Sequence, residues 1–194
     1  MRTAQIQRKT AETQVEVSLT LDGTGSAEIA TGVGFFDHML RQVARHGLFD
    51  LTIHCTGDLE VDAHHTVEDV GITLGQAFRA ALGDMAGTVR YGSAITPMDD
   101  ALSLVAIDFS GRPYLGFAVS IPAVQLGSFE TELVEEFFRA FANHAQAALH
   151  VRLLAGTNSH HIIESVFKGF GRAMDQATGR DGRLTGIRST KEIL

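Results

Sequence analysis

Alternation of hydrophobic and polar residues marks two stretches of the chain as strands. Residues 13–23 read TQVEVSLTLDG, and residues 101–121 read ALSLVAIDFSGRPYLGFAVSI. A period of two is typical of a strand with one face in the core. The longer stretch contains Ser110, Gly111 and Arg112, a combination typical of a turn. We therefore expect a β-hairpin that turns at these three residues.

Helical spacing of hydrophobic residues follows in each half of the chain. The aromatic-rich stretches GVGFFDHMLRQVARHG and LVEEFFRAFANHAQAA fit a period of 3.6 and predict helices over 32–47 and 133–148. Each predicted helix is followed by a short strand and then by a longer helix. The predicted strands are FDLTIHCTGD at 49–58 and ALHVRLLAGTN at 148–158.

The two longer predicted helices repeat one another. Residues 64–82 read HHTVEDVGITLGQAFRAAL, and residues 160–178 read HHIIESVFKGFGRAMDQAT. Both begin with His-His-x-x-Glu, and both carry a glycine, Gly75 or Gly171, at the same place. The copies are 96 residues apart (160 minus 64) in a chain of 194. Such a repeat indicates an internal duplication.

The duplication predicts the domain organisation. We expect an α+β fold of two similar halves, 1–92 and 93–194, each with helices on one face of a sheet. The seam between the halves is expected around residues 88–100. No proline-rich or serine-rich linker separates the halves. We therefore expect them to pack as one pseudo-symmetric unit.

Composition and charge exclude several classes of protein. The formal net charge of -7 argues against nucleic-acid binding, which requires a basic surface. No apolar run approaches the roughly 18 residues that span a membrane, and the first residues lack the apolar stretch of a signal peptide. The single cysteine, Cys55, is typical of a reducing compartment. We therefore expect a cytoplasmic protein that binds neither nucleic acid nor membrane.

The repeated His-His-x-x-Glu motif has the chemistry of a metal site. On a helix, Glu68 shares a face with His64, four residues away, and with His65, three residues away. The two adjacent histidines point about 100° apart, because a helix has 3.6 residues per turn. Each motif is therefore better suited to serve two ions, one histidine to each. Imidazole and carboxylate together favour Mn, Fe, Co, Ni or Zn over Ca and Mg.

Each shorter predicted helix adds one donor to this set. His38 lies 26 residues before His64 (64 minus 38), and Glu136 lies 24 residues before His160 (160 minus 136). Together the donors suffice for two ions with positions left open for a substrate. The expected metal ligands are His38, His64, His65, Glu68, Glu136, His160, His161 and Glu164.

The alternative interpretation of a His-His pair is polar surface sequence, which is the usual case for a single copy. Repetition at equivalent positions favours a metal site instead. The remaining histidines have no such symmetric counterpart. We interpret His46, His54 and His144 as structural or solvated residues. His150, in a predicted strand near the site, stays open as a further ligand.

Five segments of the chain together resemble one family. These are GVGFFDHML, DAHHTVEDVGITLG, RYGSAITPMDDAL, GTNSHHIIESVFKGFGRAM and the terminal STK. They are similar to the imidazoleglycerol-phosphate dehydratases of histidine biosynthesis, and the resemblance extends from about Arg8 to Leu194. It implies two four-stranded sheets, each with two helices on one face. It also implies two Mn²⁺ ions per active site and a large homo-oligomer, a 24-mer, with active sites between subunits.

The resemblance implies a reaction and the residues for it. The reaction is the dehydration of D-erythro-imidazoleglycerol phosphate, a small phosphorylated imidazole, to imidazole acetol phosphate. All eight donors match the family's metal ligands, and Glu136 stands where the family often has histidine. Glu12 matches the acidic residue that contacts the substrate at the reacting carbons. The phosphate-binding set is Arg90, Arg112, Lys168, Ser189 and Lys191, and Glu192 follows where the family usually has glycine.

The chemistry of this reaction accounts for these residues. Metal ions would lower the pKa of the substrate imidazole, and an imidazolate bridging two ions would expel the hydroxyl to give a diazafulvene-type intermediate. Loss of the side-chain proton requires an acid/base group, the role expected for Glu12. Asp99 is a further candidate, for positioning a water or the hydroxyl. The residues expected to act in catalysis are Glu12, His38, His65, Glu68, Asp99 and Glu164.

Some interpretations stay open at this point. Lys168 lies four residues after Glu164, so it either pairs with that carboxylate or reaches the substrate. The tail RSTKEIL is expected to close over the phosphate. A metal hydrolase of phosphoesters and a metal-storage shell are the rival functions. A storage role would leave Glu12 and the cationic residues without a function.

Overall fold

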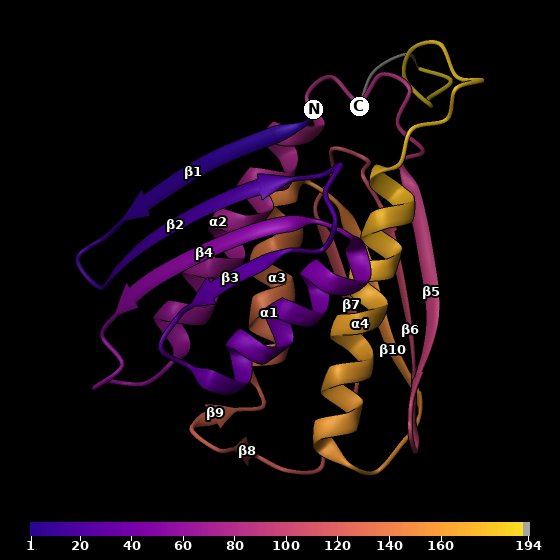
Figure 1. Cartoon of the computed structure of the whole chain (residues 1–194). Helices are drawn as coiled ribbons and strands as arrows, with labels where there is room; N and C mark the ends of the chain where they lie inside the picture. The colour runs from indigo at the N-terminus through magenta and orange to yellow at the C-terminus, as the bar shows by residue number, and fades with distance from the viewer. Residues whose placement is uncertain (192–194) are drawn as a thin grey trace.

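Two four-stranded sheets enclose four helices, which gives sheet, helix, helix and sheet layers (Figure 1). The computed structural model describes residues 1–191. The first sheet has the strand order β1-β2-β4-β3, and these strands are Thr3–Lys9, Thr13–Thr20, Asp50–Gly57 and Ala27–Ala30. The helices on its inner face are α1 (Gly34–Gly47) and α2 (His64–Leu82).

The second sheet repeats this topology. Its order is β5-β6-β10-β7, and the strands are Tyr91–Met98, Ala101–Asp108, Ala148–Ala155 and Tyr114–Ala118. Its helices are α3 (Leu133–Ala145) and α4 (Ser159–Thr178). A two-stranded ribbon, β8 (Gln125–Leu126) with β9 (Phe129–Glu130), precedes α3. The predicted α+β duplication, with two helices on one face of each four-stranded sheet, is confirmed.

The helices pair across the two halves. Helix α1 packs against α4, and α2 packs against α3. The glycine that both His-His helices share serves this packing. A methyl group at Gly75 would lie 2.7 Å from the Phe141 carbonyl oxygen of α3, and one at Gly171 would lie 2.8 Å from the Val43 carbonyl oxygen of α1. Only glycine permits these close backbone approaches.

Strand alternation places one face of each sheet in the core. In β2, Val15, Val17 and Leu19 are buried and the residues between them are more exposed. Buried phenylalanines fill the space between the helix pairs, and Phe137 of α3 contacts the rings of both Phe36 and Phe167. The packing between the two helix layers therefore positions the starts of α2 and α4, where the His-His motifs lie.

The predicted hairpin at Ser110, Gly111 and Arg112 is wrong. Strands β6 and β7 do not pair with each other, because β10 lies between them, antiparallel to β6 and parallel to β7. The inward residues Leu149 and Val151 of β10 are fully buried and occupy the central place beside β6. Alternation decides which face of a strand is buried, but it does not decide which strand is its neighbour.

Five strands lie where the sequence pattern predicted none: β1, β3 and β5 of the two large sheets, and β8 and β9 of the short ribbon. The expected seam at residues 88–100 is mostly occupied by β5, which belongs to the second sheet. The change from the first sheet to the second therefore falls in residues 83–90, between α2 and β5. No helix within residues 1–191 has both the length and the hydropathy required to cross a bilayer.

Candidate metal centre and active site

Three expected metal ligands come together where α1 meets α4. His38 of α1 and His160 and Glu164 of α4 have potential ligand atoms that all lie within 4.8 Å of one another. The Glu164 Oε2 atom is 3.0 Å from His160 Nε2 and 3.6 Å from His38 Nε2. Within residues 1–191 this is the one group of three such donors. It combines a residue of the first half with two residues of the second.

Glu164 is the buried member of this group. It is 6% exposed, and its other oxygen accepts a hydrogen bond from Lys168 Nζ at 2.7 Å. Burial by itself would raise the pKa of the Glu164 carboxyl, but the Lys168 ammonium and the neighbouring histidines outweigh burial and hold the pKa below its ordinary value. Lys168 therefore pairs with Glu164 in this structure, which was one of the two open alternatives.

The equivalent donors of the other half lie where α2 meets α3. His64 and Glu136 line one cavity of about 390 Å³, together with Arg139. Glu68 follows one turn after His64 on α2 and is half-buried. The Glu136 carboxylate lies 3.8 Å from Arg139 Nε. The repeat thus relates His64, Glu68 and Glu136 to the three clustered donors, although they do not form such a tight group in the described part of the chain.

The second histidine of each motif has carboxylate partners of its own. The rings of His64 and His65 are inclined by 86°, and those of His160 and His161 by 77°. His65 Nδ1 lies 3.0 Å from Asp58 Oδ2, and its Nε2 lies 3.7 Å from Glu12 Oε1. His65 therefore lies between Asp58 and Glu12.

His161 has the same arrangement in the second half. Its Nδ1 lies 2.7 Å from Asp100 Oδ1, and its Nε2 lies 3.5 Å from Asp99 Oδ2. Sequence reasoning missed Asp58 and Asp100, since neither has a characteristic spacing from its histidine. The Asp58 hydrogen bond raises the pKa of His65. A carboxylate that holds Nδ1–H leaves Nε2 free to bind a metal, which is a common arrangement around metal-binding histidines.

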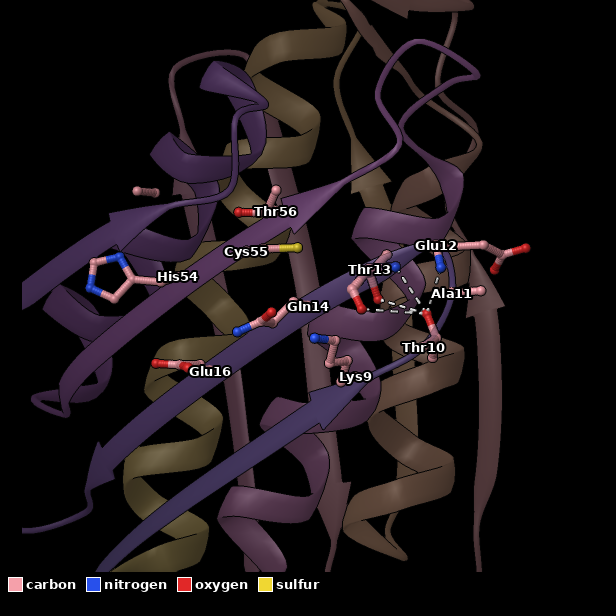
Figure 2. Close-up of a pocket in the computed structure, with 11 residues that line it drawn as sticks. Lys9, Thr10, Ala11, Glu12, Thr13, Gln14, Glu16, His54, Cys55 and Thr56 are labelled. Carbon is pink, nitrogen blue, oxygen red and sulfur yellow. Dashed lines mark hydrogen bonds between the residues drawn. The ribbon is translucent and has the colours of Figure 1, made fainter.

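Glu12 lies in the β1–β2 turn at the edge of an open cavity of about 540 Å³ on the first sheet. In Figure 2 its carboxylate points away from the other labelled side chains. His54 also lines this cavity and is 3.6 Å from Glu28, so it is a surface residue as interpreted from the sequence. His144 bonds the Ala140 carbonyl within its own helix, which fits a structural role.

His46 and His150 lie apart from the donor groups. Burial lowers the pKa of His46, which is consistent with a structural residue. The His150 ring packs 5.3 Å from that of Tyr114 and covers Gly116. Neither belongs to the three-donor group found in residues 1–191.

Four of the five predicted phosphate-binding residues line one cationic cavity of about 530 Å³. They are Arg90, Arg112, Ser189 and Lys191. Arg188, which sequence reasoning missed, adds a further cation, and Lys168 does not line the cavity. Glu192 lies outside the described residues.

Arg90 is held tightly in this cavity. Its guanidinium makes a forked pair with Asp108, at 2.6 and 3.1 Å, and donates to the Arg188 carbonyl oxygen at 2.8 Å. The Asp108 hydrogen bond raises the pKa of Arg90. Its backbone is left-handed, with φ of 77°, a conformation that side chains rarely adopt outside functional or tightly constrained positions. Arg90 is therefore a fixed cation with donors left over for a ligand.

The cationic cavity and the donor group lie at opposite ends of α4. Arg90 N donates to the carbonyl oxygen of Ala177, in the last turn of the helix, whereas His160 is in its first turn. The helix rises 1.5 Å per residue, so these ends are about 25 Å apart. Figure 1 shows the C-terminal segment at the top of the molecule and the start of α4 at the bottom.

Imidazole and carboxylate donors at one place, and a cluster of cations at another, have the chemistry of an enzyme that could bind a metal ion and an anionic substrate. Comparison with known proteins makes this specific. The family model described as imidazoleglycerol-phosphate dehydratase matches residues 31–174. The dehydratases of Trichlorobacter lovleyi and Acetivibrio thermocellus are both 58% identical over 193 residues, covering 100% of this chain and 99% of each relative.

Solved structures agree with these relatives. The crystal structure of the dehydratase from Staphylococcus aureus has a TM-score of 0.84 at 41% identity, covering 92% of this chain and 99% of that one. The structure from Pyrococcus furiosus also has a TM-score of 0.84, at 39% identity, covering 97% and 100%. The chain belongs to the imidazoleglycerol-phosphate dehydratase family. It is a hydro-lyase of histidine biosynthesis that acts on imidazoleglycerol phosphate.

Proposed function

We propose that the chain converts D-erythro-imidazoleglycerol phosphate to imidazole acetol phosphate at a centre of two Mn²⁺ ions, by way of a diazafulvene-type intermediate. The observation that carries this proposal is the convergence of His38, His160 and Glu164 from two halves of the chain. When bound, the metal would act as a Lewis acid that lowers the pKa of the substrate imidazole.

The donor set fits such ions. Neutral imidazole with a carboxylate suits manganese, iron or zinc, and the lowered pKa of Glu164 keeps this ligand ionised. His64, Glu68 and Glu136 form the matching set in the other half. His65 and His161 present a free Nε2 while Asp58 and Asp100 hold Nδ1. We propose that these eight donors hold the two ions.

Glu12 is proposed to move the proton at the reacting carbons. Its carboxylate is exposed and lies 3.7 Å from Nε2 of His65, so it stands beside a proposed ligand with room for a substrate. Asp99 occupies the equivalent place in the second half, 3.5 Å from Nε2 of His161. We propose that Asp99 positions a water molecule or the departing hydroxyl.

The phosphate is proposed to bind in the cationic cavity. Arginine forks match phosphate oxygens, and Arg90 and Arg112 stand there with Ser189 and Lys191. Lys168, paired with Glu164, is proposed to reach the substrate from the metal side. The tail is proposed to close over the phosphate once it is bound.

The separation of about 25 Å along α4 has a consequence for assembly. A small substrate is too short to reach both the donor group and the cationic cavity of one chain. We therefore propose that each active site combines residues of different subunits. The family resemblance implies a homo-oligomer of 24 chains, and we propose this assembly for the protein. Light scattering of the protein with and without a chelator tests whether the metal ligands hold subunits together. A cytoplasmic location belongs to the same proposal, and fractionation of the source cells tests it.

One assay separates this function from its rivals. The metal-loaded protein is incubated with imidazoleglycerol phosphate, and formation of the enolisable ketone is followed. Release of inorganic phosphate in place of the ketone would indicate a hydrolase. A Glu12→Gln protein that binds Mn²⁺ normally but has lost turnover supports a lyase and excludes simple metal storage.

A further inference from the structure

Asp69 is a buried acid for which the proposed reaction has no direct use. It is the residue after Glu68 on α2, and it is 5% exposed. A buried carboxylate requires ionic or hydrogen-bonding partners, because desolvation of an unpaired charge is costly. Its partners are both on the first hairpin. Arg8 Nε of β1 donates to Oδ1 at 2.7 Å, and the Thr13 hydroxyl at the start of β2 donates to Oδ2.

The turn between these two partners is held together by its own hydrogen bonds. The Thr10 hydroxyl oxygen accepts hydrogen bonds from the backbone N–H groups of Glu12, at 3.1 Å, and Thr13, at 2.9 Å (Figure 2). Thr10 N also donates to the Thr13 carbonyl oxygen at 2.9 Å. The place of the Glu12 carboxylate therefore depends on where this whole turn is held relative to α2.

Asp69 connects that turn to the metal-binding face of α2. His65 and Asp69 are four residues apart, so they share one face of the helix. The same face of α2 thus carries His65 and the Asp69 carboxylate, which accepts hydrogen bonds from both β1 and β2. We propose that Asp69 is a positioning residue, which sets the Glu12 carboxylate beside His65. This proposal rests on the proposed role of Glu12 in the reaction.

The second half provides a natural comparison. Ser165 is the counterpart of Asp69, and its hydroxyl donates to the Ile162 carbonyl oxygen within its own helix at 2.8 Å. The turn that carries Asp99 is held instead by Asp100, which accepts from the backbone N–H of Thr157 at 2.7 Å. The buried anchor is therefore specific to the turn of Glu12. Because α4 has a serine at the position equivalent to Asp69, serine is the substitution of choice for Asp69 in α2.

The test uses Asp69→Ser in the metal-loaded, assembled enzyme. Misplacement of a reacting group by about 1 Å lowers turnover by up to about 100-fold, so we expect kcat to fall by about 10–100-fold. The KM, the Mn²⁺ content and the oligomer mass should stay as in the unmodified protein. Asp22→Asn is the matched control, because it removes a carboxylate–arginine pair, with Arg2, at the other end of the same hairpin. Its kcat should be unchanged.

Two further measurements distinguish positioning from a general structural role. In the Glu12→Gln background, Asp69→Ser should cause no additional loss of kcat, since the residue acts through Glu12. Amide hydrogen exchange at residues 10–13 should become faster in Asp69→Ser, while exchange in α2 stays the same. Independent, multiplicative losses of kcat, or unchanged exchange at the turn, would overturn the proposal.

The remaining outcomes are also decisive. If Asp69→Ser does not fold, Thr13→Val, which removes one of the two anchoring contacts, is measured in the same way and should give a smaller loss of kcat. If Glu12→Gln keeps full turnover, the proposed role of Glu12 fails, and the positioning role of Asp69 fails with it. Faster exchange at the turn would then identify Asp69 as a structural anchor only.

Discussion

The glycine shared by the two His-His helices allows a matched pair of substitutions. Gly171 of α4 contacts α1 beside Val43 and Gly47, on the helix that carries His38. Gly75 of α2 contacts α3 in the equivalent way. Gly171→Ala should therefore push α4 away from α1 and separate the three clustered donors. Gly75→Ala should leave that group intact.

The size of the effect follows from the geometry. An added methyl group at Gly171 would lie 2.8 Å from a carbonyl oxygen and 3.1 Å from the Gly47 nitrogen, both backbone atoms that do not rotate away. Overpacking of this kind destabilises a protein by about 1–3 kcal/mol. Alanine offsets about 1 kcal/mol of this through its better helix propensity. We expect a net loss of up to about 2 kcal/mol, or a Tm lower by up to about 8 °C for a chain of this size.

Thermal unfolding of the metal-free proteins at equal concentration measures the stability loss. Titration with Mn²⁺, followed by the electron paramagnetic resonance of the free ion, measures binding. Both alanine variants should lose similar stability, but only Gly171→Ala should lose affinity at the site of His38. Equal weakening of Mn²⁺ binding in both variants, or a Tm that rises with either substitution, would refute this reasoning.

Three other predictions follow from the site. Glu164→Gln should weaken Mn²⁺ binding by at least about 10–100-fold, the loss seen when even an outer hydrogen-bonding partner of a ligand is removed, and the same titration checks it. Asp58→Asn should lower the Tm of the metal-free protein more at about pH 5.5 than at about pH 8.5. The stabilisation from the raised pKa of His65 is present below the unfolded pKa and is lost as the pH rises through the folded one. Arg90→Lys, which cannot keep the fork to Asp108, should raise the KM by about tenfold or more, and steady-state kinetics with an unchanged KM would contradict this.

The sequence pattern predicted those features of the fold that depend on the spacing of residues within one helix or strand. The two His-His helices follow from the 3.6-residue period of their hydrophobic positions, and the expected divergence of His64 from His65 follows from the same period. The duplication follows from the repeat of the His-His-x-x-Glu motif. The pattern could not place β7 beside β10, because the choice of a neighbouring strand depends on which strand fills the centre of the sheet. β1 was missed because its side chains are mostly polar or exposed.

The sequence pattern also could not predict the carboxylates that contact the proposed metal-ligand histidines. Asp58 and Asp100 reach their histidines through the fold, across sequence separations of 7 and 61 residues. The fold was also needed to show that Lys168 pairs with Glu164, since Nζ lies 2.7 Å from its carboxylate, and the role of Lys168 toward the substrate stays a proposal. Family resemblance supplied the set of Arg90, Arg112, Ser189 and Lys191, and the structure gathers them in one cavity.

The separation of the donor group and the cationic cavity along α4 also has a consequence for genetics. If one chain contributes the donor group and another contributes the cationic cavity, two differently defective alleles can compensate for each other. Co-assembly of Glu164→Gln chains with Arg90→Lys chains would create some sites that receive the intact residue from both sources. Random assortment in equal amounts would restore about a quarter of the sites. A cell carrying both alleles should then grow faster without added histidine than a cell carrying either allele by itself.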